Sequence, residues 1–294
     1  MTRLVSVNGR IVAPEDAKVS VYDRGFLYGD SVFETLRTYE RVPFALTEHL
    51  ARLERSATLV AMELPVSLEQ LQRELLEVLE AAGDQESYAR LMITRGQGEL
   101  GLAPSEAEAL RVILVEPLTP PPVAQRERGI AVTLYGARRA TDATLAAGAK
   151  VGNYLTSVLA MAEARRAGAA EALIVDGEGQ VLEGATSNVF VVKDGALITP
   201  PISVGILPGI TRAAVLALAR ELGIQARVAP LDVSALLAAD EVFITSSIRE
   251  LLGVVRVADQ IIGDGKPGEL THRLHSAFQE RVRSGAPFSL SHGE

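Results

Sequence analysis

Hydrophobic and polar residues alternate along several short stretches of the chain, and this period of two is typical of strands with one buried face. Residues 4–13 alternate on both sides of an Asn-Gly pair, which predicts a hairpin. Residues 171–184 and 188–201 each predict two short strands around an Asp-Gly turn. Single strands are predicted at 32–39, 88–96, 110–117, 130–136 and 240–247.

Apolar residues recur at intervals of three and four in four longer segments, and this spacing predicts helices with one apolar face. The predicted helices are 47–62, 67–83, 153–168 and 209–223, and the last three end at a glycine. In the first of them Thr47 is the expected N-cap.

A proline-rich stretch divides the chain into two halves. Four of the six residues from 117 to 122 are Pro, and the segment 117–125 is predicted to be stiff and extended. We therefore expect an N-terminal α/β domain at 1–117, a linker at 118–126 and a C-terminal domain at 127–294.

The composition narrows the class of protein. With 48% hydrophobic residues among 294, the chain can bury a sizeable core, and its net charge of −8 argues against a general nucleic-acid binder. It has no Cys, which excludes disulfides and thiolate chemistry. The four His form no metal-ligand pattern, and His272 and His275 are interpreted as a solvated helix face. No segment resembles a signal peptide or a membrane span, so we expect a cytoplasmic protein.

Lys150 stands out because the chain otherwise uses Arg for basic charge. Of 29 basic residues only four are Lys, which leaves 29 − 4 = 25 Arg. Lys193 and Lys266 lie in obvious turns, whereas Lys150 follows five small or apolar residues and precedes an apolar helix. A primary amine can lose its proton and form a Schiff base, which Arg cannot do. Lys150 is therefore the candidate nucleophile.

Several other features could bind a cofactor, although each alone has an ordinary structural interpretation. The Pro-Gly turn before residue 210 leads directly into a helix, so the N–H groups of Ile210 and Thr211 can face an anion. Glu183 lies between strands beside small residues, and Arg52 lies on the first long helix. An amine, a carboxylate, an anion-binding helix start and an Arg together are what pyridoxal phosphate requires.

Ordered motifs throughout the chain make this interpretation specific. They are DRGFLYGDSVFETLR (23–37), HLARLERSA (49–57), RLMITRGQGELGL (90–102), KVGNYL (150–155), EGATSNVFVVKDGALITPP (183–201), GILPGITR (205–212) and ADEVFITSSIREL (239–251). With them the chain resembles the class IV aminotransferases, the fold-type IV pyridoxal-phosphate enzymes. The resemblance implies an α+β fold of two domains, a small N-terminal α/β domain and a larger C-terminal pseudo-barrel domain with helices that binds the cofactor. It also implies a homodimer.

The resemblance further assigns roles to residues. Lys150 forms the Schiff base with the cofactor and then carries the proton, in a ping-pong reaction between an amino acid and a 2-oxo acid. Glu183 binds the pyridine nitrogen, and Tyr154 binds the phenolic oxygen. The phosphate and the remaining cofactor contacts are assigned to Arg52, Ser187, Asn188, Ile210, Thr211, Ser246 and Ser247. The candidates for binding the substrate carboxylate are Tyr28, Arg90, Ser247, Ile248 and Arg249, with Arg95 and Arg138 as further possibilities.

The motifs point to different members of the family. Thr186 and Ser187 in EGATSN resemble the Ser-rich loop of D-amino acid transaminases, so we expect D-alanine or D-glutamate as the amino donor, with 2-oxoglutarate or pyruvate as the acceptor. Tyr88-Ala89-Arg90 instead resembles branched-chain aminotransferases, which makes an L-branched-chain enzyme the first alternative. An aminodeoxychorismate lyase is the second, and Glu99 stands where many lyases have a basic residue. A non-catalytic, cofactor-binding protein is the remaining possibility.

Overall fold

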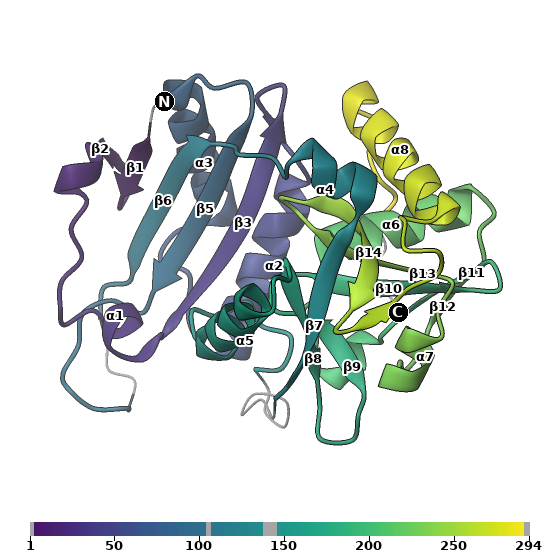
Figure 1. The fold of residues 1–294 in the computed structure, drawn as a ribbon. Coiled ribbons are helices and arrows are strands. Elements are labelled where there is room, and N and C mark those ends of the chain that lie inside the picture. Colours follow the sequence, from purple (N-terminus) through teal and green to yellow (C-terminus); the bar gives the residue numbers. More distant parts are fainter. Residues whose placement is uncertain (1–2, 104–106, 138–145, 291–294) are drawn as a thin grey trace. The chain divides into compact units, whose positions relative to one another are not determined.

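The computed structural model describes residues 3–103, 107–137 and 146–290, and their contacts form two compact units (Figure 1). Unit 1 comprises Met1–Thr119 and Ala149–Tyr154, and unit 2 comprises Pro120–Gly148 and Leu155–Glu294. The domain bounds expected from the proline-rich stretch stay a prediction. No helix within the described ranges is long and apolar enough to cross a membrane.

Unit 1 contains a six-stranded antiparallel sheet in the order β2-β1-β6-β5-β3-β4. The strands are β1 Leu4–Val7, β2 Arg10–Val12, β3 Ser31–Tyr39, β4 Val42–Pro43, β5 Ser87–Thr94 and β6 Leu110–Pro117. The predicted hairpin is confirmed, because β1 and β2 pair across Asn8 and Gly9, both with positive φ.

Two long helices of unit 1 cover one face of this sheet (Figure 1). The helices of unit 1 are α1 Arg24–Tyr28, α2 Leu46–Leu59 and α3 Leu68–Ala82, with a 3₁₀ turn at Pro14–Asp16. Gly83 ends α3, as the sequence predicts, and Ser67 is its N-cap. The predicted N-cap of α2 is wrong: Ala45 occupies that position with a left-handed backbone and no capping side chain, and Thr47 lies inside the first turn.

Strand β3, which lies next to the edge strand β4, carries a charged residue on its core-facing side. Val32 and Leu36 belong to the core that packs against α2 and α3. Because side chains alternate along a strand, Glu34 lies on the same face as these two apolar residues, and its side chain is fully buried. Phe33 lies on the opposite face. This alternation places a charged residue inside the core of unit 1.

Unit 2 is built around a nine-stranded mixed sheet that curls on itself. Its order is β12-β11-β10-β13-β14-β7-β8-β9, with β15 paired to β14. The strands are β7 Ile130–Gly136, β8 Glu171–Val175, β9 Val181–Gly184, β10 Asn188–Lys193, β11 Ala196–Thr199, β12 Ala226–Val228, β13 Glu241–Ser246, β14 Glu250–Val257 and β15 Gln260–Ile261. The terminal strand β9 returns to contact β10, and an apolar core fills the curl. This is the pseudo-barrel with helices that the resemblance implies.

Five helices belong to the described part of unit 2: α4 Val123–Arg128, α5 Leu155–Arg166, α6 Ile210–Glu221, α7 Val233–Leu237 and α8 Glu269–Ser284, with a 3₁₀ turn at Ile202–Val204. Helix α5 packs on β7 and β8, whereas α6 and α8 pack together on β13 (Figure 1). The expectation of an extended chain through residue 125 is wrong, because α4 begins at Val123. The interpretation of His272 and His275 as a solvated helix face is correct only for the first of them. His272 is exposed, but His275 hydrogen bonds to Glu250.

Candidate active site

The backbone of Lys150 is fixed from two sides in unit 1. Its N–H donates to Ser56 Oγ on α2 at 3.0 Å, and its carbonyl accepts from the N–H of Phe33 on β3 at 3.1 Å. Gly152 continues the contact by donating to the carbonyl of Ser31. A Cβ at Gly152 would lie 2.1 Å from Ser31 Oγ, so a larger residue would displace Ser31. The segment around Lys150 therefore runs along β3 in a defined position.

The amine of Lys150 lies among aromatic groups and a second cation. Its Nζ donates to Tyr154 Oη at 3.2 Å and lies 4.5 Å from the centre of the Phe33 ring. The guanidinium carbon of Arg90 lies 3.8 Å from the same centre, and the Tyr154 ring meets Phe33 edge-on at 5.2 Å. Cations pack favourably on aromatic faces. Phe33 thus gathers three of the residues singled out in the sequence.

A buried ion pair joins α2 to β3. Arg52 donates from Nε to Glu34 Oε1 and from Nη2 to Glu34 Oε2, both at 2.7 Å. His49 Nδ1 lies 2.7 Å from the same Oε2. All three side chains are at least nine-tenths buried. This bidentate geometry fixes the plane of the guanidinium as well as its position.

The charges in this cluster follow from its contacts. Burial raises the pKa of Glu34, but the charge and hydrogen bonds of Arg52, together with His49, outweigh it and lower the pKa to about 2. Burial lowers the pKa of His49, and this outweighs the opposing effect of the Glu34 carboxylate. Glu34 is therefore an anion at neutral pH, and His49 is a neutral ring whose Nδ1–H donates to it.

In unit 2, Glu183 lies within β9 rather than between strands. The residue is 8% exposed, and its Oε2 accepts from the N–H of Leu207 at 3.1 Å and from Asn188 Nδ2 at 3.4 Å. The Asn188 amide also donates to the carbonyl of Leu207 at 2.9 Å. The segment before α6 is thereby tied to a buried carboxylate.

The first turn of helix α6 is suited to binding an anion. Gly209 is its N-cap and supplies no capping side chain, so the first-turn N–H groups have no acceptor within the helix. The hydroxyl of Thr211 is buried, and no group in the described part of the chain hydrogen bonds to it. A Cβ at Gly209 would lie 1.8 Å from Asn188 Oδ1, so a larger residue would displace Asn188. The helix start and the unpartnered hydroxyl suit a phosphate oxygen.

A second buried carboxylate in unit 2, that of Glu171, forms hydrogen bonds or an ion pair with several of the remaining candidate site residues. Glu171, fully buried at the start of β8, accepts from Thr186 Oγ1 at 2.8 Å and from Ser187 Oγ at 3.2 Å, and it forms an ion pair with Arg249. Arg249 also donates to Thr186, and its backbone N–H donates to Ser246 Oγ. Glu171 thus connects the loop after β9 to the turn after β13.

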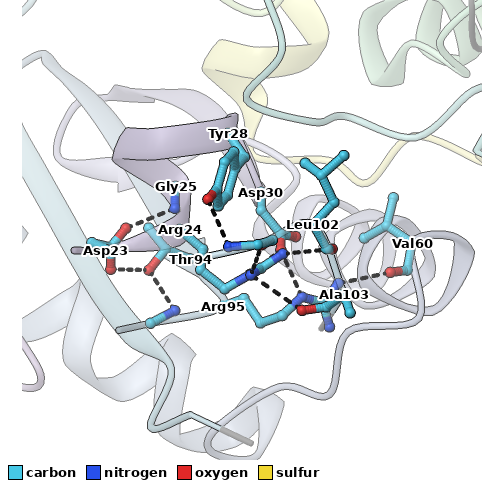
Figure 2. A network of polar contacts seen from close by, with 12 residues as sticks. Asp23, Arg24, Gly25, Tyr28, Asp30, Val60, Thr94, Arg95, Leu102 and Ala103 are labelled. Carbon is cyan, nitrogen blue, oxygen red and sulfur yellow. Dashed lines mark hydrogen bonds and ion pairs between the residues drawn. The ribbon is translucent and has the colours of Figure 1, made fainter. Parts of the chain in front are cut away.

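Tyr28 belongs to a separate polar network in unit 1 (Figure 2). Its Oη accepts from the N–H of Gly101, and Arg24 packs over its ring. Asp30 Oδ2 accepts from both Arg24 Nε and Arg95 Nε, at 2.9 and 2.8 Å, between the two guanidinium groups (Figure 2). Burial raises the pKa of Asp30, but the two arginines outweigh it and lower the pKa. The backbone carbonyls bound by these two arginines are those of Val60, Ala61, Gly101, Leu102 and Ala103.

The site residues predicted from the sequence therefore fall into separate groups in the structure. Lys150, Tyr154 and Arg90 gather at Phe33, whereas Arg95 joins Tyr28 around Asp30. In unit 2 one group forms around Glu183 and another around Glu171. Ile210 is buried in the first turn of α6, and Ser247 and Ile248 follow the end of β13. Arg138 lies outside the described residues.

Six polar residues of these groups were not singled out from the sequence: Glu34, His49, Ser56, Glu171, Arg24 and Asp30. A signal for the first three was present. His49, Arg52 and Ser56 are spaced three and four residues apart, which places them on one face of a helix. Glu34 interrupts an alternating apolar row. Polar residues on a face expected to be buried mark a site.

Comparison with known proteins gives consistent results. Residues 31–257 match the family described as amino-transferase class IV. A putative branched-chain-amino-acid aminotransferase of Methanocaldococcus jannaschii is 40% identical over 276 residues, which cover 94% of this chain and 95% of the relative. A D-alanine aminotransferase of Bacillus licheniformis is 34% identical over 286 residues, covering 95% and 97%. The solved structure of a T.th. branched-chain amino acid aminotransferase with pyridoxamine 5'-phosphate has a TM-score of 0.91 at 35% identity, covering 97% of this chain and 95% of that one.

Proposed function

This chain belongs to the class IV aminotransferases, which use pyridoxal phosphate, and on that premise we propose that it transfers the amino group of an L-branched-chain amino acid to a 2-oxo acid such as 2-oxoglutarate. The observation that carries the substrate class is the 40% identity, over 94% of the chain, to a relative named as a putative branched-chain enzyme. Arg90 on the Phe33 ring, in the Tyr-x-Arg segment, supports the same choice.

The D-amino acid preference expected from Thr186 and Ser187 is less well supported. Both hydroxyls donate to Glu171, so the residues that suggested it have a structural function inside unit 2. The D-alanine aminotransferase of Bacillus licheniformis, at 34% identity, keeps D-alanine as the second candidate substrate.

The residues fit the cofactor. Thr211 offers a buried hydroxyl without a protein partner in the described ranges, and Gly209, the N-cap of α6, supplies no side chain to cap the first-turn N–H groups. When bound, pyridoxal phosphate supplies an aldehyde for an amine and a ring that withdraws electrons from the substrate α-carbon. Arg52 and the start of α6 would hold its phosphate, and the Glu183 carboxylate would keep the ring nitrogen protonated.

The proton transfer is assigned to Lys150. Its Nζ would remove the α-proton of the amino acid and would return it to the cofactor carbon bonded to the amino nitrogen, and Tyr154 Oη holds the amine from one side at 3.2 Å. The fixed backbone of Lys150, bonded to Ser56 and Phe33, limits where the amine can move. Substrate carboxylates are assigned to Arg90, to Tyr28 and to the turn formed by Ser247, Ile248 and Arg249.

Initial rates with L-leucine, D-alanine and their 2-oxo acid acceptors test the proposed substrate. We expect L-leucine to have the higher kcat/KM, with parallel double-reciprocal lines from a ping-pong reaction. A higher kcat/KM for D-alanine would establish the second candidate instead. Release of pyruvate from aminodeoxychorismate without an amino acceptor would establish the lyase. A homodimer, which the family resemblance implies, stays a prediction that light scattering can test.

A further inference from the structure

Glu34 is an unusual residue for its position. It lies on the core-facing side of β3 between Val32 and Leu36, and its side chain is fully buried. A carboxylate there loses its hydration, which is strongly unfavourable unless partners compensate. Packing alone would be satisfied by an apolar side chain, so the charge requires another explanation.

Stability does not provide that explanation. Replacing a buried ion pair by well-packed apolar residues is often neutral or stabilising, because the attraction between the charges only offsets their desolvation. Glu34, Arg52 and His49 form such a buried cluster. What the cluster does provide is a defined geometry. Two parallel 2.7 Å hydrogen bonds fix the guanidinium plane, and the His49 contact holds the carboxylate that makes them.

We propose that Glu34 is a positioning residue that holds the Arg52 guanidinium in the orientation required by the cofactor phosphate, with His49 fixing the Glu34 carboxylate in turn. This inference rests on the proposed binding of the phosphate by Arg52. A long, flexible arginine side chain would otherwise lose its freedom when the phosphate binds, and prior orientation removes that cost.

The proposal predicts a selective effect. If Glu34 acts through Arg52 on the phosphate, its loss must weaken the binding of pyridoxal phosphate but not that of pyridoxal, which lacks the phosphate. A residue that only maintained the fold would affect both ligands alike. The ratio of the two dissociation constants is therefore the informative quantity.

Two substitutions separate geometry from charge. Glu34→Gln keeps the shape but turns one of the two acceptors into a donor that faces an Arg52 N–H. Glu34→Asp keeps the charge but is one methylene shorter, so it cannot make both contacts in the same place. Glu54→Gln, on the exposed face of the same helix as Arg52, is the control for the change in net charge.

The measurement is a titration of the cofactor-free protein with pyridoxal phosphate and with pyridoxal, followed by absorbance. We expect both Glu34 variants to raise the dissociation constant of pyridoxal phosphate roughly tenfold or more, and that of pyridoxal by less than about twofold. Arg52→Lys should show the same loss of selectivity, and adding Glu34→Gln to it should change little further. Glu54→Gln should resemble the unsubstituted protein.

Three results would overturn the proposal. Equal weakening of both ligands would make Glu34 a residue of the fold. Normal affinity of Glu34→Asp for pyridoxal phosphate, or a higher affinity of Glu34→Gln for it, would show that only the net charge beside Arg52 matters. If the unsubstituted protein bound neither ligand, the proposed function itself would be wrong, and this outcome is distinct from the other two. Should the Glu34 variants fail to fold, His49→Phe removes the contact that fixes the carboxylate and must weaken pyridoxal phosphate selectively.

Discussion

Lys150 and Tyr154 face each other, with the amine nitrogen 3.2 Å from the phenol oxygen. The Phe33 ring lies beside both, and the backbone of Lys150 is bonded to α2 and β3. An amine held in this way has few orientations available. This restriction is what a residue needs in order to remove a proton from one carbon and return it to another carbon close by.

Tyr154→Phe removes the hydrogen bond while keeping the ring against Phe33. We expect the rate of the half-reaction with L-leucine to fall about 3- to 10-fold or more, because the amine loses a partner of ordinary hydrogen-bond strength. Stopped-flow absorbance measures this rate. Tyr22→Phe, at an exposed tyrosine, should leave it unchanged. An unaltered rate in Tyr154→Phe would show that the phenol does not act on Lys150.

Gly209→Ala should weaken the proposed binding of the cofactor at the start of α6. The added Cβ would lie 1.8 Å from Asn188 Oδ1, so Asn188 must move away from Glu183 and Leu207. We expect the affinity for pyridoxal phosphate to fall roughly tenfold, since two hydrogen bonds are disturbed. Gly136→Ala is the control, because nothing lies within 4 Å of its added Cβ. Similar affinities in both variants would contradict the assigned site.

Glu171→Ala should destabilise unit 2. It leaves Arg249 without its carboxylate and removes the acceptor of Thr186 and Ser187, so we expect a loss of about 3 kcal/mol in the free energy of unfolding. Urea denaturation measures this loss, with Glu178→Ala on the exposed turn of the same hairpin as control. The double variant with Arg249→Ala should recover part of it. A loss below about 0.5 kcal/mol, as at surface sites, would refute the assigned importance of Glu171.

His49 should make the cofactor-free protein less stable in mild acid. Burial lowers the pKa of His49 below 6.5, so between the two pKa values the unfolded chain binds a proton that the folded chain does not. The free energy of unfolding should therefore fall as the pH drops below 6.5, by up to about 1.4 kcal/mol per pH unit. Urea unfolding at several pH values measures this slope. His49→Phe should flatten it and His272→Gln should not; equal slopes in all three proteins would exclude His49 as the cause.

The parts of the fold that depend on neighbours in sequence could be predicted. The Asn8-Gly9 turn sets the first hairpin, and Ser67 and Gly83 mark the ends of α3, because each acts within a few residues. For helix α8 only a solvated face with His272 and His275 was expected and its bounds were not predicted, since few apolar residues define its buried face. Helix α2 begins at a left-handed Ala45 that no local rule indicates.

Residues of the candidate site could be predicted only where they belong to a recognisable sequence motif. Lys150 is conspicuous among four lysines, and the family motifs assign Glu183 and Arg52. The buried carboxylates Glu34 and Glu171 were missed, because their partners lie far away in sequence. Glu34 meets Arg52 across 18 residues, and Glu171 meets Arg249 across 78. Such pairs depend on the tertiary fold rather than on local patterns.

Locating the lysine that binds the cofactor tests the central claim most directly. Reduction of the protein with borohydride in the presence of pyridoxal phosphate links the cofactor permanently to the amine it occupies, and mass spectrometry of the peptides identifies that amine. The chain offers only Lys18, Lys150, Lys193 and Lys266. We expect the added mass on the peptide that contains Lys150. Its appearance on another lysine, or on none, would contradict the assignment of Lys150 and the proton transfer built on it.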